Sequence, residues 1–149
     1  MKVAVLMGST SDEAKMAAAR ETLEHFGIEV DWRVMSAHRT PTAVLDLASN
    51  ARQNGYVAMI CGAGMAAHLA GAVAAHTTLP VVGVPLSGGA LNGVDALYAT
   101  VQMPKGIPVA TVAIDGSMNA ALLVLQMLAI TDESLQAKLA EHRAEMAAR

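Results

Sequence analysis

The chain has 149 residues and a formal net charge of −3, and it is 54% hydrophobic but only 3% aromatic. This length is sufficient for one domain with a complete hydrophobic core. The negative balance of charge provides no electrostatic footprint for binding nucleic acid. Cys61 is the only cysteine, so an intrachain disulfide is impossible and a reducing, cytoplasmic compartment is expected.

Two apolar segments, residues 57–75 and 107–130, have the length of a membrane span. Glycines and His68 interrupt the first segment, and Pro108 and Asp115 interrupt the second. Interrupted runs of this kind are typical of buried strand-loop-helix units, so no membrane association is expected. The apolar run near the N-terminus is too short for a signal-peptide core and is interpreted as a strand.

The first third of the chain predicts two strand-helix units. Val3–Met7 is expected to form the first strand, and apolar residues then recur at helical spacing, at Met16, Ala19, Leu23 and Phe26. Ile28–Val34 is expected to form the second strand. The helix after it is marked by apolar side chains at Val44, Leu47, Ala48 and Ala51.

The same alternation continues to the end of the chain. Further strands are expected at Tyr56–Cys61, Val81–Val84 and Val109–Ile114. Helices over about 65–76 and 118–130 are apolar nearly all round, which is typical of helices buried on most sides. Residues 131–149 predict a last amphipathic helix that no strand follows. This helix can pack on its own domain or on a neighbouring subunit, and we favour the neighbour.

Alternating strands and helices predict an α/β fold with a parallel sheet covered on both faces. We expect a flavodoxin-like, three-layer, doubly wound sheet in a single domain over residues 1–149, with an extra C-terminal helix. In such sheets, ligands bind beyond the carboxyl ends of the strands. Four loops leave these ends, at residues 8–12, 36–41, 62–68 and 85–93, and the fold is expected to bring them to one rim.

The first loop places hydroxyl groups directly before a helix start. Backbone N–H groups and partial positive charge at a helix N-terminus suit a phosphate, which Ser9 and Ser11 could also contact. Ser11 is equally well placed as a plain helix cap. Asp12 could accept hydrogen bonds from sugar hydroxyls, or it could simply favour the helix dipole as a first-turn acid.

The second loop combines Ser36, His38 and Arg39 before Pro41, which suits the first turn of a helix. A guanidinium group binds phosphate in a two-pronged geometry, and the Ser36 hydroxyl supplies another donor. A surface salt bridge is the alternative for Arg39. Histidine side chains titrate near neutral pH, so His38 can act as general acid and base, unless it is a structural histidine.

The third loop, residues 62–68, is rich in small residues. Backbone amides around Gly64 could surround a small anion or a carboxylate, to which His68 could hydrogen-bond. Helix packing is the alternative for His68. No cysteine or carboxylate stands near His38 or His68 at a familiar ligand spacing, so no metal site is expected.

Five segments carry a resemblance to a known family. They read MGSTSD at Met7–Asp12, SAHRTP at Ser36–Pro41, GAGMAAHLAG at Gly62–Gly71, LPVVGVP at Leu79–Pro85 and VQMPKGIPVATVAI at Val101–Ile114. In these segments the chain resembles the N5-carboxyaminoimidazole ribonucleotide mutases of bacterial purine biosynthesis, once called the catalytic subunit of phosphoribosylaminoimidazole carboxylase. The resemblance implies a three-layer α/β homo-octamer that moves a carboxylate from an exocyclic nitrogen to ring carbon 4, without metal, ATP or organic cofactor.

The resemblance also implies roles for individual residues. Ser9, Asp12 and Arg39 look like substrate-binding residues, with Asp12 at the ribose. Ser11 and Ser36 look like helpers of Arg39 at the phosphate. His38 looks like the general acid and base. The loop that contains Gly64 and His68 looks like the wall that holds the migrating carboxylate.

Two positions depart from the family pattern, because Met65 stands where the family usually has Gly and Ala70 where it usually has Pro. A second branch of the family uses CO2 directly, but its members lack a segment like Ala66–His68, so the mutase is favoured over the direct carboxylase. A non-enzymatic nucleotide-binding domain and a flavin-binding protein are further alternatives. The low aromatic content disfavours flavin, which usually stacks on aromatic rings.

Overall fold

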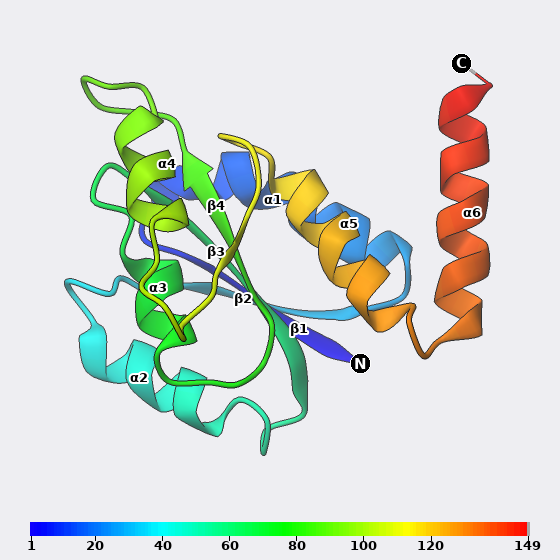
Figure 1. Ribbon diagram of the computed structural model, residues 1–149, viewed down its shortest axis with the longest axis horizontal. Coiled ribbons are helices and arrows are strands. Elements are labelled where there is room, and N and C mark those ends of the chain that lie inside the picture. The colour runs from blue at the N-terminus through cyan, green and yellow to red at the C-terminus, as the bar shows by residue number, and fades with distance from the viewer. Residues whose placement is uncertain (149) are drawn as a thin grey trace.

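The computed structural model describes residues 1–148, in which five parallel strands form one sheet with helices on both faces (Figure 1). The strands are β1 (Lys2–Met7), β2 (Glu29–Val34), β3 (Tyr56–Gly64), β4 (Val81–Leu86) and β5 (Ala110–Thr111). Their order across the sheet is β2-β1-β3-β4-β5. This is the flavodoxin-like doubly wound order, so the predicted fold class is confirmed.

The helices of the described residues form two layers and an extension. They are α1 (Glu13–His25), α2 (Pro41–Asn50), α3 (Leu69–Ala74), α4 (Val94–Val101), α5 (Ser117–Leu128) and α6 (Glu133–Ala147). A short 3-10 turn, η1 (Thr10–Asp12), precedes α1. Helices α1 and α5 cover one face of the sheet, and α2, α3 and α4 cover the other (Figure 1). Pro41 begins α2, as predicted.

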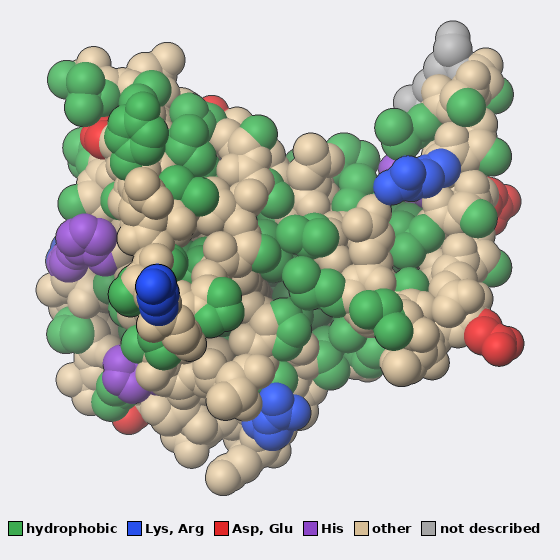
Figure 2. All heavy atoms as spheres, viewed as in Figure 1, with side chains coloured by type: hydrophobic (Ala, Val, Ile, Leu, Met, Phe, Trp, Pro, Cys, Tyr) green, Lys and Arg blue, Asp and Glu red, His purple; other side chains and the backbone are tan. Residues whose placement is uncertain are grey.

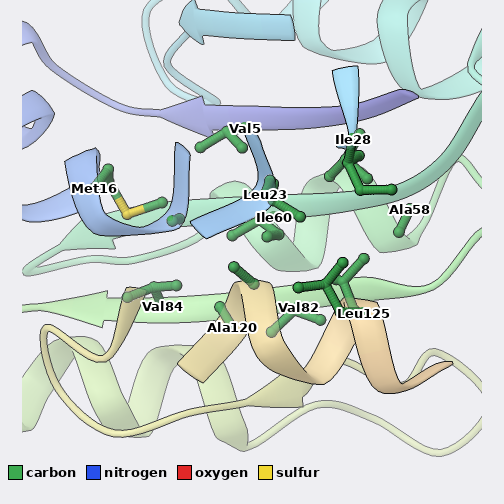
Figure 3. Close-up of a cluster of buried hydrophobic side chains, with 14 of the residues drawn as sticks. Val5, Met16, Leu23, Ile28, Ala58, Ile60, Val82, Val84, Ala120 and Leu125 are labelled. Carbon is green, nitrogen blue, oxygen red and sulfur yellow. The ribbon is translucent and has the colours of Figure 1, made fainter. Parts of the chain in front are cut away.

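Side chains along β1 point alternately to the two faces of the sheet and pack into two separate cores. Val3, Val5 and Met7 point to the face of α1 and α5, whereas Ala4 and Leu6 point to the face of α2 and α3. Figure 3 shows the first core, in which strand residues of β1, β3 and β4 face side chains of α1 and α5. Both faces of the sheet are therefore buried, as the apolar strands predict.

Gly62 fixes the distance between α1 and the end of β3. A Cβ atom on this glycine would lie 2.4 Å from the Met16 sulfur atom. Met16 is fully buried in the first core (Figure 3). The start of α1 therefore packs directly on the end of β3, where the candidate site lies.

Two elements differ from the sequence prediction. The helix expected over 65–76 begins only at Leu69, because β3 continues to Gly64 and Met65 adopts a φ of 48°. The strand expected at Val109–Ile114 pairs with β4 only at Ala110 and Thr111. Both differences lengthen the loops at the carboxyl edge of the sheet.

Helix α6 leaves the body of the molecule after a capped start (Figure 1). The Asp132 carboxylate accepts hydrogen bonds from the backbone N–H groups of Ser134 at 3.0 Å and Leu135 at 3.1 Å. Leu135 is buried in the first core, while most residues beyond it are exposed. Within residues 1–148, no helix has the length and apolar character needed to cross a membrane.

Candidate active site

A cavity of about 510 Å³ opens at the carboxyl ends of β1, β2 and β3. Strand β1 lies between β2 and β3, so the chain reverses its direction across the sheet at this point. Ligands of doubly wound folds bind at such a switch point. All eight residues singled out in the sequence line this cavity, namely Ser9, Ser11, Asp12, Ser36, His38, Arg39, Gly64 and His68.

The first loop turns tightly into α1. The Ser9 hydroxyl accepts a hydrogen bond from the backbone N–H of Ser11 at 3.3 Å, and the Ser11 hydroxyl donates to it at 2.9 Å. Ser9, rather than Ser11, is therefore the capping residue of η1, which corrects the alternative role considered for Ser11. Both hydroxyls face the cavity beside the backbone N–H groups that start the helix.

Asp12 lies partly buried at the base of this loop. Burial raises the pKa of its carboxyl group above the ordinary value, against the opposing effects of the Lys15 ammonium, the Ser9 backbone N–H and the Arg39 guanidinium. The effect of desolvation on this pKa is therefore larger than the opposite effect of the nearby positive charges. Hydrogen bonds donated by a ligand hydroxyl would stabilise the ionised form of this partly buried carboxyl group.

The second loop is closed by its own side chains. The Ser36 hydroxyl accepts hydrogen bonds from the backbone N–H groups of His38 at 3.3 Å and Arg39 at 3.1 Å. The Thr40 hydroxyl accepts from the Ser36 N–H at 3.0 Å and donates to the Ser36 carbonyl at 3.1 Å. These bonds hold the backbone of His38 and Arg39 at the cavity, and the Ser36 hydroxyl proton is left to donate to a ligand.

Arg39 joins the second loop to the first. Its guanidinium group donates a hydrogen bond to the Gly8 carbonyl at 2.5 Å. A guanidinium group has five N–H donors in a planar fork, so most of its donors remain for another partner. Arg39 is exposed at the cavity mouth beside Ser9 and Ser11, where it can meet an anion.

His38 and His68 are brought into direct contact across the cavity. His38 Nε2 and His68 Nδ1 are 2.8 Å apart, and the rings lie edge to face with their centroids 4.8 Å apart. This hydrogen bond requires a proton on one of the two facing nitrogens. The two imidazoles therefore share one proton, and each fixes the orientation of the other.

The third loop forms one side of the cavity, mostly with small residues. Gly64, Met65 and Ala66 line the cavity, and the backbone turns through a hydrogen bond of 2.8 Å from the Ala67 N–H to the Met65 carbonyl. Cys61 lies behind this wall in β3. Its complete burial raises the pKa of its thiol to about 12, which leaves the group protonated and inert, as expected of a buried apolar cysteine.

The fourth loop lies at the same edge of the sheet, as expected, and contacts Met65 of the third loop, but its residues do not line the cavity. Two contacts hold this loop in place. The Lys15 ammonium donates to the Ser87 carbonyl, and Asp115 Oδ1 accepts from the Ser87 N–H at 2.9 Å. Sequence reasoning missed Lys15, although its position three residues after Asp12 places both on the same side of α1.

A larger cavity of about 660 Å³ lies at the opposite end of the sheet. Its basic side chains make separate contacts, because Arg52 donates to the Thr78 hydroxyl at 3.2 Å and His76 Nδ1 meets the Ala72 carbonyl at 2.8 Å. It has no adjacent acid-base pair among the described residues. The smaller cavity, with its two contacting imidazoles, is therefore the candidate active site. Within residues 1–148, no three His, Cys, Asp or Glu side chains cluster as metal ligands.

Comparisons with known proteins give a consistent result. A family model described as AIR carboxylase matches residues 2–149. The N5-carboxyaminoimidazole ribonucleotide mutase of Vibrio vulnificus is 50% identical over 147 residues, covering 97% of this chain and 91% of the relative. The proteins of the same name from Pyrococcus abyssi and Escherichia coli K12 are 49% and 50% identical, covering 97% and 95% of this chain and 83% and 85% of their own lengths.

Among solved structures, the crystal structure of Treponema denticola PurE superposes with a TM-score of 0.89 at 28% sequence identity. The match covers 98% of this chain and 91% of the Treponema chain. The resemblance predicted from five sequence segments thus extends over nearly the whole chain and its fold. The chain belongs to the AIR carboxylase family.

Proposed function

We propose that this chain converts N5-carboxyaminoimidazole ribonucleotide into 4-carboxy-5-aminoimidazole ribonucleotide in purine biosynthesis. The observation that carries the proposal is the meeting of the His38–His68 pair with Arg39 and Asp12 around one cavity. A volume of about 510 Å³ lies within the range of small-molecule sites. The names of relatives about 50% identical to this chain agree with this reaction.

The substrate phosphate binds at the first and second loops. Arg39 supplies a planar pair of N–H donors, and the hydroxyls of Ser9, Ser11 and Ser36 supply further donors around it. The backbone at the start of η1 and α1 adds partial positive charge. The Asp12 carboxylate, beside this phosphate pocket, accepts hydrogen bonds from the ribose hydroxyls.

The chemistry takes place at the imidazole pair. His38 in its protonated form donates a proton to the exocyclic nitrogen, the nitrogen–carbon bond breaks, and CO2 leaves. Ring carbon 4 then attacks the CO2 carbon and forms a carbon–carbon bond. Neutral His38 removes the carbon 4 proton, which restores the aromatic ring and regenerates the protonated imidazole. The proton that His38 gives to the nitrogen is replaced by the proton it takes from carbon 4, and the carboxylate stays with the product, so the reaction is an isomerisation.

His68 acts beside His38 in two ways. In the free protein it orients the His38 ring through the hydrogen bond of 2.8 Å. During the reaction it stands at the third loop, next to Gly64, where it can donate a hydrogen bond to the migrating carboxylate. The small residues of this loop leave room for CO2 close to the ring, where carbon 4 can attack it.

An assay with two substrates tests the proposal. Purified protein receives either the carbamate N5-carboxyaminoimidazole ribonucleotide or aminoimidazole ribonucleotide with a low concentration of bicarbonate. We expect product from the carbamate alone. Product formed only from the uncarboxylated nucleotide and CO2 would identify a direct carboxylase. Binding of nucleotide with no product from either would indicate a non-enzymatic nucleotide-binding domain, and a yellow protein would indicate bound flavin.

We also propose that residues 1–149 act as one domain in a cytoplasmic homo-oligomer, an octamer by family resemblance. An apolar groove of about 740 Å³ runs between α5 and α6, with Leu122, Leu123, Leu139 and Met146 in its lining. Figure 2 shows hydrophobic side chains along the hollow between α6 and the body. The leucines are partly buried against the first core and Met146 is exposed, so the groove is an apolar surface beside a projecting helix that a second copy of the chain is expected to cover.

A further inference from the structure

Met65 stands in an unusual position at the candidate active site. Its φ of 48° lies in the left-handed region, which is unfavourable for a residue with a side chain and natural for glycine. In residues 1–148 the other non-glycine residues with positive φ are Asn92 and Asp115. All three lie in loops at the carboxyl edge of the sheet, where backbone strain commonly accompanies function.

The Met65 side chain spans the gap between the third and fourth loops. Its Cγ and Sδ atoms lie 3.1 and 3.2 Å from the position that a Cβ atom on Gly89 would occupy. A side chain on Gly89 would thus displace Met65. The fourth loop on which Met65 rests is anchored by the contacts of Ser87 with Lys15 and Asp115.

The rest of this wall cannot close the cavity. Gly64 and Ala66 are small, and the Leu69 side chain is buried in the second core. Met65 is 59% exposed, so it has the freedom to move when a nucleotide enters. A methionine side chain is unbranched and flexible, which suits a surface that must open and close.

We propose that Met65 is a retention residue, resting on Gly89 to close the carboxylate end of the cavity and keep CO2 beside the aminoimidazole ring until carbon 4 attacks it. This inference rests on the proposed mutase function. Without the side chain, CO2 escapes to water and the uncarboxylated aminoimidazole ribonucleotide is released instead of product. Met65 acts by closing the site and takes no part in proton transfer.

Three substitutions separate the side chain from the backbone strain. Met65→Ala removes the closing atoms and keeps the Cβ atom that strains the backbone. Met65→Gly removes both, and Met65→Leu keeps a side chain of similar size. Met118→Ala, at an exposed methionine at the start of α5 outside the cavity, is the matched control.

The first measurement is the ratio of released aminoimidazole ribonucleotide to carboxylated product, starting from the carbamate. We expect this ratio to rise several-fold in Met65→Ala and Met65→Gly and to stay near the wild-type value in Met65→Leu and Met118→Ala. Unchanged ratios in the Ala and Gly variants would overturn the proposal. So would a Leu variant that leaks as much as the Ala variant.

The second measurement does not depend on turnover. Diethyl pyrocarbonate modifies exposed imidazoles, and peptide mass analysis gives the rate of modification at His38. We expect faster modification in Met65→Ala and Met65→Gly than in the wild type, and equal rates would overturn closure by Met65. If the wild-type protein forms no product from the carbamate, the proposed function and CO2 retention both fail, while these rates still decide whether Met65 closes the cavity.

Discussion

The imidazoles of His38 and His68 are 30 residues apart in the chain and 2.8 Å apart in space. Because the hydrogen bond needs a proton on one facing nitrogen and a lone pair on the other, each ring fixes the orientation and tautomer of its neighbour. The pair therefore holds the His38 imidazole in a defined position, from which it can exchange a proton with a substrate. Sequence alone suggested an acid-base role for His38 and a carboxylate contact for His68, but not that the two rings touch.

Replacing His38 and Arg39 is expected to separate chemistry from binding. His38→Asn should lower kcat by about 10²–10⁴-fold, because it removes the group that transfers protons, with KM little changed. Arg39→Ala should weaken substrate binding by about 2 kcal/mol, with a smaller effect on kcat. Steady-state kinetics with the carbamate and calorimetric binding of the product provide the measurements.

Arg52→Ala is the matched control for Arg39→Ala, because Arg52 bonds to Thr78 at the opposite end of the sheet. It should leave both kinetic constants unchanged. A His38→Asn protein that turns over at the wild-type rate would contradict the mechanism.

Asp12→Asn is expected to stabilise the protein while weakening ribose binding. Burial raises the pKa of the Asp12 carboxyl in the folded state, so its ionised form opposes folding. The Asn variant should therefore have a slightly higher Tm at pH 7. This advantage should shrink as pH falls and vanish below the unfolded value of 3.8, where the carboxyl is protonated in both states. Thermal unfolding between pH 3 and 7 measures the effect, and a lower Tm at pH 7 would contradict it.

At the scale of elements, the strands and most helices were predictable from periodicity, whereas the loop after β3 was not. Small apolar residues over 65–76 suit a helix and a buried turn equally well, so composition could not place the start of α3 at Leu69. The left-handed backbone at Met65 decides the outcome, and it depends on support from the fourth loop. Such tertiary support leaves no signal in local sequence.

The start of α6 provides a prediction at the same scale. The hydroxyl and backbone N–H of Ser134 and the N–H of Leu135 bond to the Asp132 carboxylate and lower its pKa. Asp132→Ala should therefore lower the Tm at pH 7, as loss of a helix cap does. Because the folded pKa is below 3.8, the effect should persist above that pH and fade as pH drops through the folded value.

Glu133→Ala, one residue further along, is the control for the cap, and circular dichroism follows the unfolding of both variants. An equal loss of Tm in the two variants would show that general helix propensity or charge, and not the Asp132 cap, is responsible.

For the whole molecule, the order of the strands explains why the position of the cavity can be predicted from the sequence. Parallel strands end at one edge, and the reversal of direction at β1 opens that edge between β1 and β3. Polar residues of the first three loops are therefore expected to converge, and Asp12, His38 and His68, one from each loop, line the same cavity. The fourth loop follows β4, which lies one strand further from the opening, so this loop lies at the same edge without lining the cavity.

The groove between α5 and α6 makes a prediction about assembly. Met146→Asp should shift the protein toward smaller species, because it places a charge on an apolar surface that a second copy covers. Ala144→Asp adds the same charge to an exposed position of α6 outside the groove lining, and it should leave the assembly intact. Light scattering during size-exclusion chromatography measures the mass. A wild-type monomer, or equal dissociation of both variants, would contradict the assignment.

The single cysteine can report whether each of these variants remains folded. Cys61 is 1% exposed within the central strand β3, so a thiol-labelling reagent can reach it only in molecules that have opened around this strand or unfolded. The labelling rate under native conditions therefore reports the population of opened molecules, without interference from a second sulfhydryl group. If a variant loses activity while Cys61 is still labelled slowly, the substitution has impaired catalysis or binding. If Cys61 is labelled quickly, the substitution has destabilised the fold.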